Sequence, residues 1–273
     1  MKSGLLMNNF ASRMLINIIG IPAILLLIHL GGIPFVLFIT VMVFIAQVEL
    51  YLLMRKKGIA PLLLPGVLAG VIWQFASFYL TGALLLYLLI GLVVLLLLAS
   101  LKRQIKGVTV DLASTLFGFV YLPVLTSTII LMRNIPGNGR SIVFLLFGTI
   151  WVCDSLAFVF GKWLGRRKIA PKISPNKTYA GCIGGLFGAV LTVLIFYFLG
   201  WAPDFMSIMQ LIIFGLLAGV FGQAGDFVES AFKRDAEVKD SSNLLLGHGG
   251  VLDRFDSFFI AAPVIYLYII TVL

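Results

Sequence analysis

Apolar stretches long enough to cross a lipid bilayer dominate this chain of 273 residues. A bilayer core needs about 20 apolar residues to be crossed by a helix, and lipid offers no partner to unpaired backbone groups, so such stretches must be helical. Only 11% of the residues are charged, whereas a soluble domain carries about 25%. We therefore expect an all-α polytopic membrane protein. Its nine spans are predicted at approximately 14–31, 34–54, 61–80, 82–101, 112–132, 141–165, 179–201, 208–232 and 253–272.

The segments that connect these spans alternate between uncharged and basic. If the N-terminus is cytoplasmic, the basic links at 55–57, 102–106 and 166–168 all lie on the cytoplasmic side, as does every Lys and Arg except Arg133 and Arg140. Cytoplasmic loops of membrane proteins carry such an excess of Lys and Arg. We expect a cytoplasmic N-terminus, an external C-terminus after the ninth span, and a bacterial inner (plasma) membrane as the location.

Other compositional features narrow the function classes. A net charge of +9 would favour nucleic-acid binding in a soluble protein. In a membrane protein the excess of Lys and Arg marks the cytoplasmic loops, so we expect no nucleic-acid partner. Cys153 and Cys182 form no Cys-x-x-Cys spacing, and two histidines are too few for a multi-histidine metal site. The absence of a Walker A loop and of a Gly-x-Ser-x-Gly elbow argues against a P-loop ATPase and an α/β-hydrolase.

Acidic side chains stand where lipid should make them costly. A carboxylate deep in the bilayer costs at least about 2.5–3.5 kcal/mol, so each is a functional-site hypothesis. Six acids lie within or at the ends of predicted spans: Glu49, Asp154, Asp226, Glu229, Asp253 and Asp256. For Glu49 two interpretations stay equal: it lines the cytoplasmic cavity, or it accepts a hydrogen bond from a neighbouring helix.

Two predicted spans each carry a pair of carboxylates three residues apart. Asp226 and Glu229 form one pair, and Asp253 and Asp256 form the other. Residues at this spacing share a helix face, and carboxylates with an open coordination sphere suit Mg²⁺ together with substrate phosphates. The ordinary alternative for the second pair is capping of a helix N-terminus.

Cations and glycines surround these acids. Cationic side chains can bind phosphate, and Arg can do so with two parallel hydrogen bonds; the candidates are Lys233, Arg234, Lys239 and Arg254. Glycines at 247, 249 and 250 precede the last span, where backbone N–H groups at a helix N-terminus favour phosphate. The alternatives are a positive-inside flank for the cations and a tight turn for the glycines.

A second group of candidates lies upstream. Asp154 is deep in the sixth span, and the alternative to a functional role is a buried acid paired with a Lys or Arg of another helix. The loop 168–178 combines prolines, cations and hydroxyls. Such a loop can clamp phosphate, or it can be an ordinary basic cytoplasmic loop.

The run from Ser230 to Asp256 resembles the signature of the phosphatidate cytidylyltransferases (CDP-diacylglycerol synthases). The matching residues are Ser230, Lys233, Arg234, Lys239, Asp240, His248, Gly249, Gly250, Asp253, Arg254 and Asp256. Asp154 and the run Ser174-Pro-x-Lys177-Thr178 are also similar to that family, so the clear resemblance covers about residues 150–265. The chain departs from the family pattern at Leu246, where proline is usual, and at Ala180, where glutamate is usual.

The resemblance implies that CTP and phosphatidic acid react to give CDP-diacylglycerol and pyrophosphate, in phospholipid biosynthesis, at a cytoplasmic site. It implies Mg²⁺ on Asp226, Asp253 and Asp256, and paired carboxylates can support a second cation. The expected catalytic residues are Asp226, Lys233, Arg234, Lys239, Asp240, His248, Asp253, Arg254 and Asp256. The expected substrate-binding residues are Asp154, Ser174, Lys177, Thr178, Ser230, Gly249 and Gly250.

The same resemblance also implies a division of the chain into two regions and a set of partners. Residues 1–132, with spans one to five, would be a scaffold, and residues 133–273 would be the catalytic membrane region. The expected partners are CTP, phosphatidic acid and membrane lipid, and a homodimer stays open as an oligomeric state.

Two alternatives to this function remain. Another CTP-using membrane enzyme, such as a CDP-archaeol synthase or a polyprenol kinase, would differ in the tail of its substrate. A cation or phosphate transporter would also place acids inside the membrane, but transporter sites lie near the midplane, often between internal repeats. The chain shows no repeat, and its charges crowd at one interface, which favours an enzyme.

Overall fold

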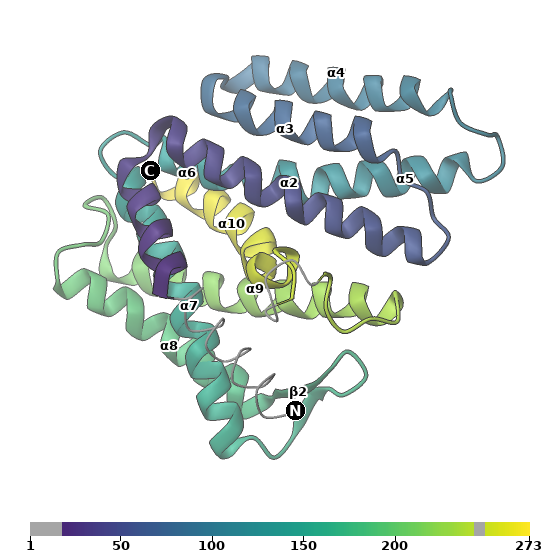
Figure 1. The fold of residues 1–273 in the computed structure, drawn as a ribbon. Helices are drawn as coiled ribbons and strands as arrows, with labels where there is room; N and C mark the ends of the chain where they lie inside the picture. The colour runs from purple at the N-terminus through teal and green to yellow at the C-terminus, as the bar shows by residue number, and fades with distance from the viewer. Residues whose placement is uncertain (1–17, 243–248) are drawn as a thin grey trace. The chain divides into compact units, whose positions relative to one another are not determined.

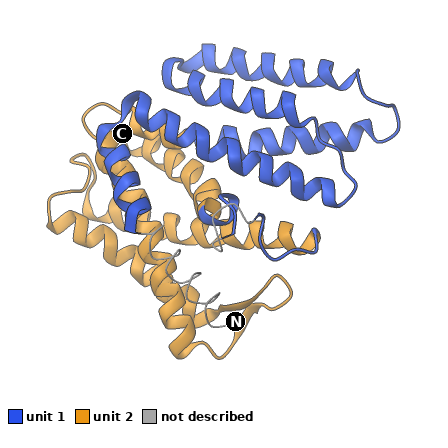
Figure 2. Ribbon diagram, viewed as in Figure 1, with its two compact units in different colours: residues 1–127, 236–254 blue, residues 128–235, 255–273 orange. Residues whose placement is uncertain are grey.

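The computed structural model describes residues 18–242 and 249–273 and divides into two compact units (Figure 2). Unit 1 comprises Met1–Ser127 and Ala236–Arg254, and unit 2 comprises Thr128–Asp235 and Phe255–Leu273. The segment 236–254 therefore groups with the N-terminal helices, although the sequence assigned it to the catalytic region. The functional division into scaffold and catalytic region stays a prediction.

Helices form almost the whole architecture (Figure 1), which confirms the all-α membrane class. Among the described residues, seven helical segments are long and apolar enough to cross a membrane. They are α2 (Gly32–Lys56), α4 (Gly82–Ser100), the continuous run Val108–Arg133, α7 (Gly139–Leu164), α8 (Tyr179–Phe198), α9 (Ile208–Asp235) and α10 (Leu252–Val272). Shorter apolar helices, Ile18–Leu30 and α3 (Leu63–Tyr79), lie where the two other spans were predicted. The orientation of the termini stays a prediction.

The core of unit 1 is organised around Tyr51 of α2, which is fully buried. Its hydroxyl donates to the carbonyl of Thr115 at 2.8 Å and accepts from the side-chain amide of Gln47 at 3.0 Å. Gly66 and Gly118 leave room for the ring, since a Cβ at either position would collide with it. A buried hydroxyl without partners would be costly, so this network fixes how α2 packs.

The run Val108–Arg133 is not a uniform α-helix. It consists of α5 (Val108–Phe119), a π-helical turn η1 (Val120–Val124) and α6 (Leu125–Arg133). Pro123 lies inside the turn, where its ring and its missing N–H disrupt the regular ladder. The side-chain amide of Gln74 donates to the carbonyl of Pro123 at 3.0 Å, so a neighbouring helix supplies a hydrogen bond to this irregular backbone.

In unit 2, glycines of α8 allow close packing against α7, as small residues at the interfaces of membrane helices commonly do. A Cβ at Gly185 would lie 3.0 Å from the carbonyl oxygen of Cys153, and one at Gly188 would lie 2.9 Å from Leu156. Gly184 meets the ring of Phe160 in the same way. This packing holds α8 against the C-terminal half of α7, which carries Asp154.

The loop predicted at 168–178 forms a short antiparallel hairpin. Strand β1 (Lys168–Ala170) pairs with β2 (Ser174–Thr178), with Lys168 opposite Thr178 and Ala170 opposite Ser174. The sequence analysis did not predict these strands. The Thr178 hydroxyl, which is buried, accepts from the N–H of Gly181 at 3.1 Å and so caps the first turn of α8.

Candidate functional site

An acidic cluster lies in unit 2, where α7, α9 and α10 supply one or two carboxylates each. The cluster consists of Asp154, Asp226, Glu229 and Asp256, and the first three lie close enough to Asp256 to act on it electrostatically. Gly225 makes this arrangement sterically possible, because a Cβ there would lie 3.1 Å from the Cα of Ser257 and would collide with the carbonyl of Asp256. The backbones of α9 and α10 therefore approach closely beside the acids.

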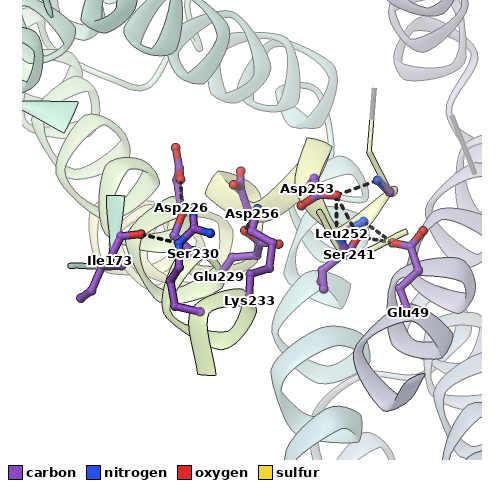
Figure 3. Close-up of polar contacts among 12 residues, drawn as sticks. Glu49, Ile173, Asp226, Glu229, Ser230, Lys233, Ser241, Leu252, Asp253 and Asp256 are labelled. Carbon is purple, nitrogen blue, oxygen red and sulfur yellow. Dashed lines mark hydrogen bonds and ion pairs between the residues drawn. The ribbon is translucent and has the colours of Figure 1, made fainter. Parts of the chain in front are cut away.

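Asp226 is held by two partners from nearby segments. Lys177 of β2 places its ammonium 2.7 Å from the carboxylate. The hydroxyl of Ser230 donates to the same carboxylate at 3.2 Å (Figure 3). The Lys177 ammonium also lies 4.1 Å from the centre of the Phe227 ring, a distance at which a cation is attracted to an aromatic face. The structure thus brings together three predicted site residues, Lys177, Asp226 and Ser230.

Glu229 lies one turn further along α9 and is fully buried. The ammonium of Lys233 lies 2.6 Å from its carboxylate, and only 12% of the Lys233 side chain is exposed. Burying a single charge is costly, whereas an ion pair offsets part of that cost. Lys233 was predicted as a catalytic cation, and its pairing with Glu229 places it at the edge of the acidic cluster.

The end of α9 is tied to the hairpin. The guanidinium of Arg234 donates through Nε to the carbonyl of Ile173 at 3.2 Å (Figure 3), and Ile173 immediately precedes Ser174 on β2. Together with the Lys177–Asp226 ion pair, this contact fixes the hairpin against α9 at two points. The predicted phosphate-clamping loop is therefore attached to the helix that carries Asp226.

The beginning of α10 belongs to unit 1, where Asp253 binds Ser241 and Gly250, which precede the helix. One carboxylate oxygen of Asp253 accepts from the backbone N–H of Gly250 at 2.6 Å and from the N–H and hydroxyl of Ser241 at 3.0 and 2.9 Å. Gly249 has a φ of +81°, and a Cβ there would lie 2.6 Å from the same oxygen. Glycine at 249 is therefore required by backbone conformation and by the nearby carboxylate.

For the remaining predicted site residues that it describes, the structure gives the position and exposure of the side chain. Lys239, Asp240 and Arg254 are exposed in unit 1, and Ser174 begins β2 with partial exposure. His248 lies outside the described residues, as does Leu246. Roles in catalysis for all of these stay predictions.

The donor chemistry of the acidic cluster fits a hard divalent cation. Lys177 and Lys233 pair with two of its four carboxylates, and carboxylate oxygens are ligands that Mg²⁺ prefers. Across residues 18–242 and 249–273, however, no three His, Cys, Asp or Glu side chains are arranged as a complete metal-binding group. In proteins Mg²⁺ is commonly held by one or two carboxylates together with substrate phosphates.

Sequence reasoning underrated two residues of this region. Gly225 was not considered, although glycines recur at 215, 219, 222 and 225 along α9, a spacing that marks a closely packed helix face. Glu229 was recognised as an intramembrane acid but was not included among the site residues. Its spacing of four residues from Lys233 was the signal that could have linked the two.

Comparison with known proteins agrees with this picture. Residues 11–272 match the sequence model of the Cytidylyltransferase family. The chain is 34% identical to the phosphatidate cytidylyltransferase of Bacillus subtilis, over 95% of this chain and 97% of that protein. It is 32% identical to the enzymes of that name from Synechocystis and from Staphylococcus saprophyticus, over 96% and 95% of this chain and 97% and 99% of those proteins.

Proposed function

The chain belongs to the Cytidylyltransferase family, and from that membership we propose that it transfers CMP from CTP to phosphatidic acid, releasing pyrophosphate and forming CDP-diacylglycerol. Relatives named phosphatidate cytidylyltransferase match it over nearly their whole length. Full-length similarity of this kind supports the same reaction, not only a shared fold.

The observation that carries the proposal is the acidic cluster at the end of α9, with Lys177 and Lys233 paired to its members. Carboxylates inside apolar helices persist only where they serve a function or a partner. A triphosphate with Mg²⁺ can bind both the carboxylates and the cationic side chains of the cluster. The ion binds carboxylates, and the phosphate oxygens bind ammonium and guanidinium groups.

The transfer of CMP to phosphatidic acid requires little proton transfer by the protein. A phosphate oxygen of phosphatidic acid, which is already anionic, attacks the α-phosphorus of CTP, and the bond from that phosphorus to the oxygen bridging to the β-phosphorus breaks. The electron pair leaves with pyrophosphate. Catalysis then consists of holding the two substrates in line and neutralising their charges.

Specific residues would perform these tasks. Asp226 and Asp256, with Asp253 three residues earlier on α10, would hold Mg²⁺, which supplies charge neutralisation of the triphosphate. Lys177 and Lys233 would exchange part of their contact with carboxylates for contact with substrate phosphates. Further predicted contributors are Asp154, Ser174, Thr178, Ser230, Arg234, Lys239, Asp240, His248, Gly249, Gly250 and Arg254.

The site would open to the cytoplasm, where CTP is found. The basic links at 55–57, 102–106 and 166–168 support that orientation by the positive-inside rule. We place the protein in the bacterial plasma membrane, with the lipid substrate arriving from the bilayer and the nucleotide from water.

Labelled CTP tests this proposal against its nearest alternatives. With label on the α-phosphate, the purified protein in phosphatidate vesicles should transfer label into lipid, and label on the γ-phosphate should appear in pyrophosphate. A polyprenol kinase would instead pass the γ-label to lipid, and a CDP-archaeol synthase would prefer an ether-linked acceptor. Absence of lipid labelling from α-labelled CTP would refute the assignment.

A further inference from the structure

Glu49 is a buried acid of α2 that the proposed chemistry does not use. Only 4% of it is exposed, yet it lies about 200 positions before the segment that it contacts. One carboxylate oxygen, Oε1, accepts from the hydroxyl of Ser242 at 2.5 Å and from the N–H of Val251 at 3.2 Å. The other, Oε2, accepts from the hydroxyl of Ser241 at 3.2 Å and from the N–H of Leu252 at 2.8 Å (Figure 3). All five residues belong to unit 1.

These contacts make Glu49 a cap supplied from another helix. Helix α10 begins at Leu252, and the first N–H groups of a helix have no acceptor within the helix itself. A side chain just before the helix usually provides that acceptor. Here the carboxylate of Glu49 accepts from Val251 and Leu252, and its negative charge also suits the positive end of the helix dipole.

Gly250 has its steric explanation in the same contact. A Cβ at Gly250 would collide with the Ser241 hydroxyl and would lie within 2.5 Å of the Glu49 carboxylate. The sequence analysis assigned this glycine to substrate binding. In the structure it leaves the space through which α2 reaches the start of α10.

The cap is connected to Asp253 through one hydroxyl group. The oxygen of Ser241 lies 3.2 Å from the Glu49 carboxylate and 2.9 Å from that of Asp253. The backbone N–H groups of Ser241 and Gly250 donate to Asp253, and those of Val251 and Leu252, at the start of α10, donate to Glu49. Glu49 and Asp253 therefore bind residues 241–242 and 250–252 from two sides.

We propose that Glu49 is a positioning residue: it fixes the first turn of α10 and thereby sets where Asp253 and, three residues later, Asp256 present their carboxylates. This role rests on the proposed function, because it matters for turnover only if those acids serve the nucleotidyl transfer. Helix α2, which was predicted to be part of the scaffold, would thus help to position the active-site carboxylates.

Glu49→Gln is the sharpest test, because it keeps size and shape. Both oxygens accept from a backbone N–H, so whichever way the Gln amide is turned, its NH₂ group faces an N–H that cannot accept a hydrogen bond. We expect kcat to fall roughly 10- to 100-fold, as for residues that orient metal ligands, with a higher Mg²⁺ concentration for half-maximal activity. Glu49→Asp, which keeps the charge, should recover part of kcat.

Amide hydrogen exchange gives a second readout that needs no activity. The N–H groups of Val251 and Leu252 should exchange faster in Glu49→Gln than in the wild type. Thr40→Val is the matched control, since Thr40 is a buried polar residue of α2 whose hydroxyl bonds only one turn back, to Val36, at 2.7 Å. It should change neither kcat nor exchange at 251–252.

The outcomes separate the inference from the proposed function. Wild-type kcat and Mg²⁺ dependence in folded Glu49→Gln would overturn the positioning role, and so would a lower yield of protein with unchanged kcat per folded molecule. If the wild type itself fails to label lipid, the proposed function fails, while unchanged exchange at Val251 and Leu252 would still refute the cap. If Glu49→Gln does not fold, Ser242→Ala removes a single donor to Glu49 and should show the same effects in weaker form.

Discussion

Replacing Lys233 by methionine should destabilise unit 2 more than the loss of one surface charge would. Glu229 is 0% exposed and the Lys233 side chain 12% exposed, with ammonium and carboxylate 2.6 Å apart. Removing one partner of a buried ion pair costs about 3–5 kcal/mol, because the other charge stays buried. An exposed lysine should matter far less, within about 0.5 kcal/mol, and Lys106 provides that control as Lys106→Met.

Thermal unfolding in detergent, compared among variants under one protocol, measures this difference. The double variant Glu229→Gln/Lys233→Met should recover most of the lost stability, since neutral groups of similar size replace both charges. If Lys233 also neutralises substrate phosphate, the double variant should stay inactive with α-labelled CTP. A Lys233→Met protein that melts with the Lys106→Met control would refute the buried-pair reasoning, and a fully active double variant would remove Lys233 from the site.

Further changes test other parts of the account. Lys177→Met removes the ion pair to Asp226 and should lower kcat/KM about 10- to 100-fold, because a hydrogen bond to a charged group contributes about 1.5–3 kcal/mol; steady-state kinetics measure it, and unchanged kinetics would exclude a role. Gly225→Ala should cost about 1–3 kcal/mol through overpacking, whereas Gly91→Ala, with nothing within 4 Å, should not; equal melting temperatures would refute that contact. Chelation with EDTA should abolish lipid labelling and Mg²⁺ should restore it, and labelling that survives chelation would exclude the metal. A cysteine at Lys172 should react with reagents only from the cytoplasmic side, and external labelling would reverse the topology.

The fold class could be predicted from the sequence because long apolar runs in lipid must satisfy their backbone hydrogen bonds internally, as a helix does. The predicted spans 82–101 and 208–232 correspond closely to α4 and α9. The hairpin at Lys168–Thr178 was missed because its strands, of three and five residues, are too short to show a period-two alternation of apolar residues. Pro123 lies inside the π-helical turn, but the hydrogen bond that Gln74 donates to its carbonyl joins residues far apart in sequence, and a local pattern does not predict such a contact.

Prediction of the site was limited for the same reason. Asp226 and Lys233 were identified from their chemistry in an apolar context, but the pairing of Asp226 with Lys177 follows from packing. The pairing of Lys233 with Glu229 could have been predicted from their spacing of four residues. Spacing showed that Asp253 and Asp256 share a helix face, yet it could not show that Asp253 binds the N–H of Gly250. Contacts between segments far apart in the chain are set by tertiary structure. The sequence shows which residue types are present but not which of them pair.

The central claim is that the acidic cluster is the reaction centre for CMP transfer to phosphatidic acid. The most direct measurement compares lipid labelling from α-labelled CTP by the wild type, Asp256→Asn and Asp204→Asn, in phosphatidate vesicles with Mg²⁺. Asp204 is an exposed acid outside the cluster, so its variant should label lipid like the wild type. Asp256→Asn should fold normally and lose at least about 100-fold in rate, the scale on which removal of a group that stabilises transition-state charge acts. Wild-type labelling by folded Asp256→Asn would contradict the account.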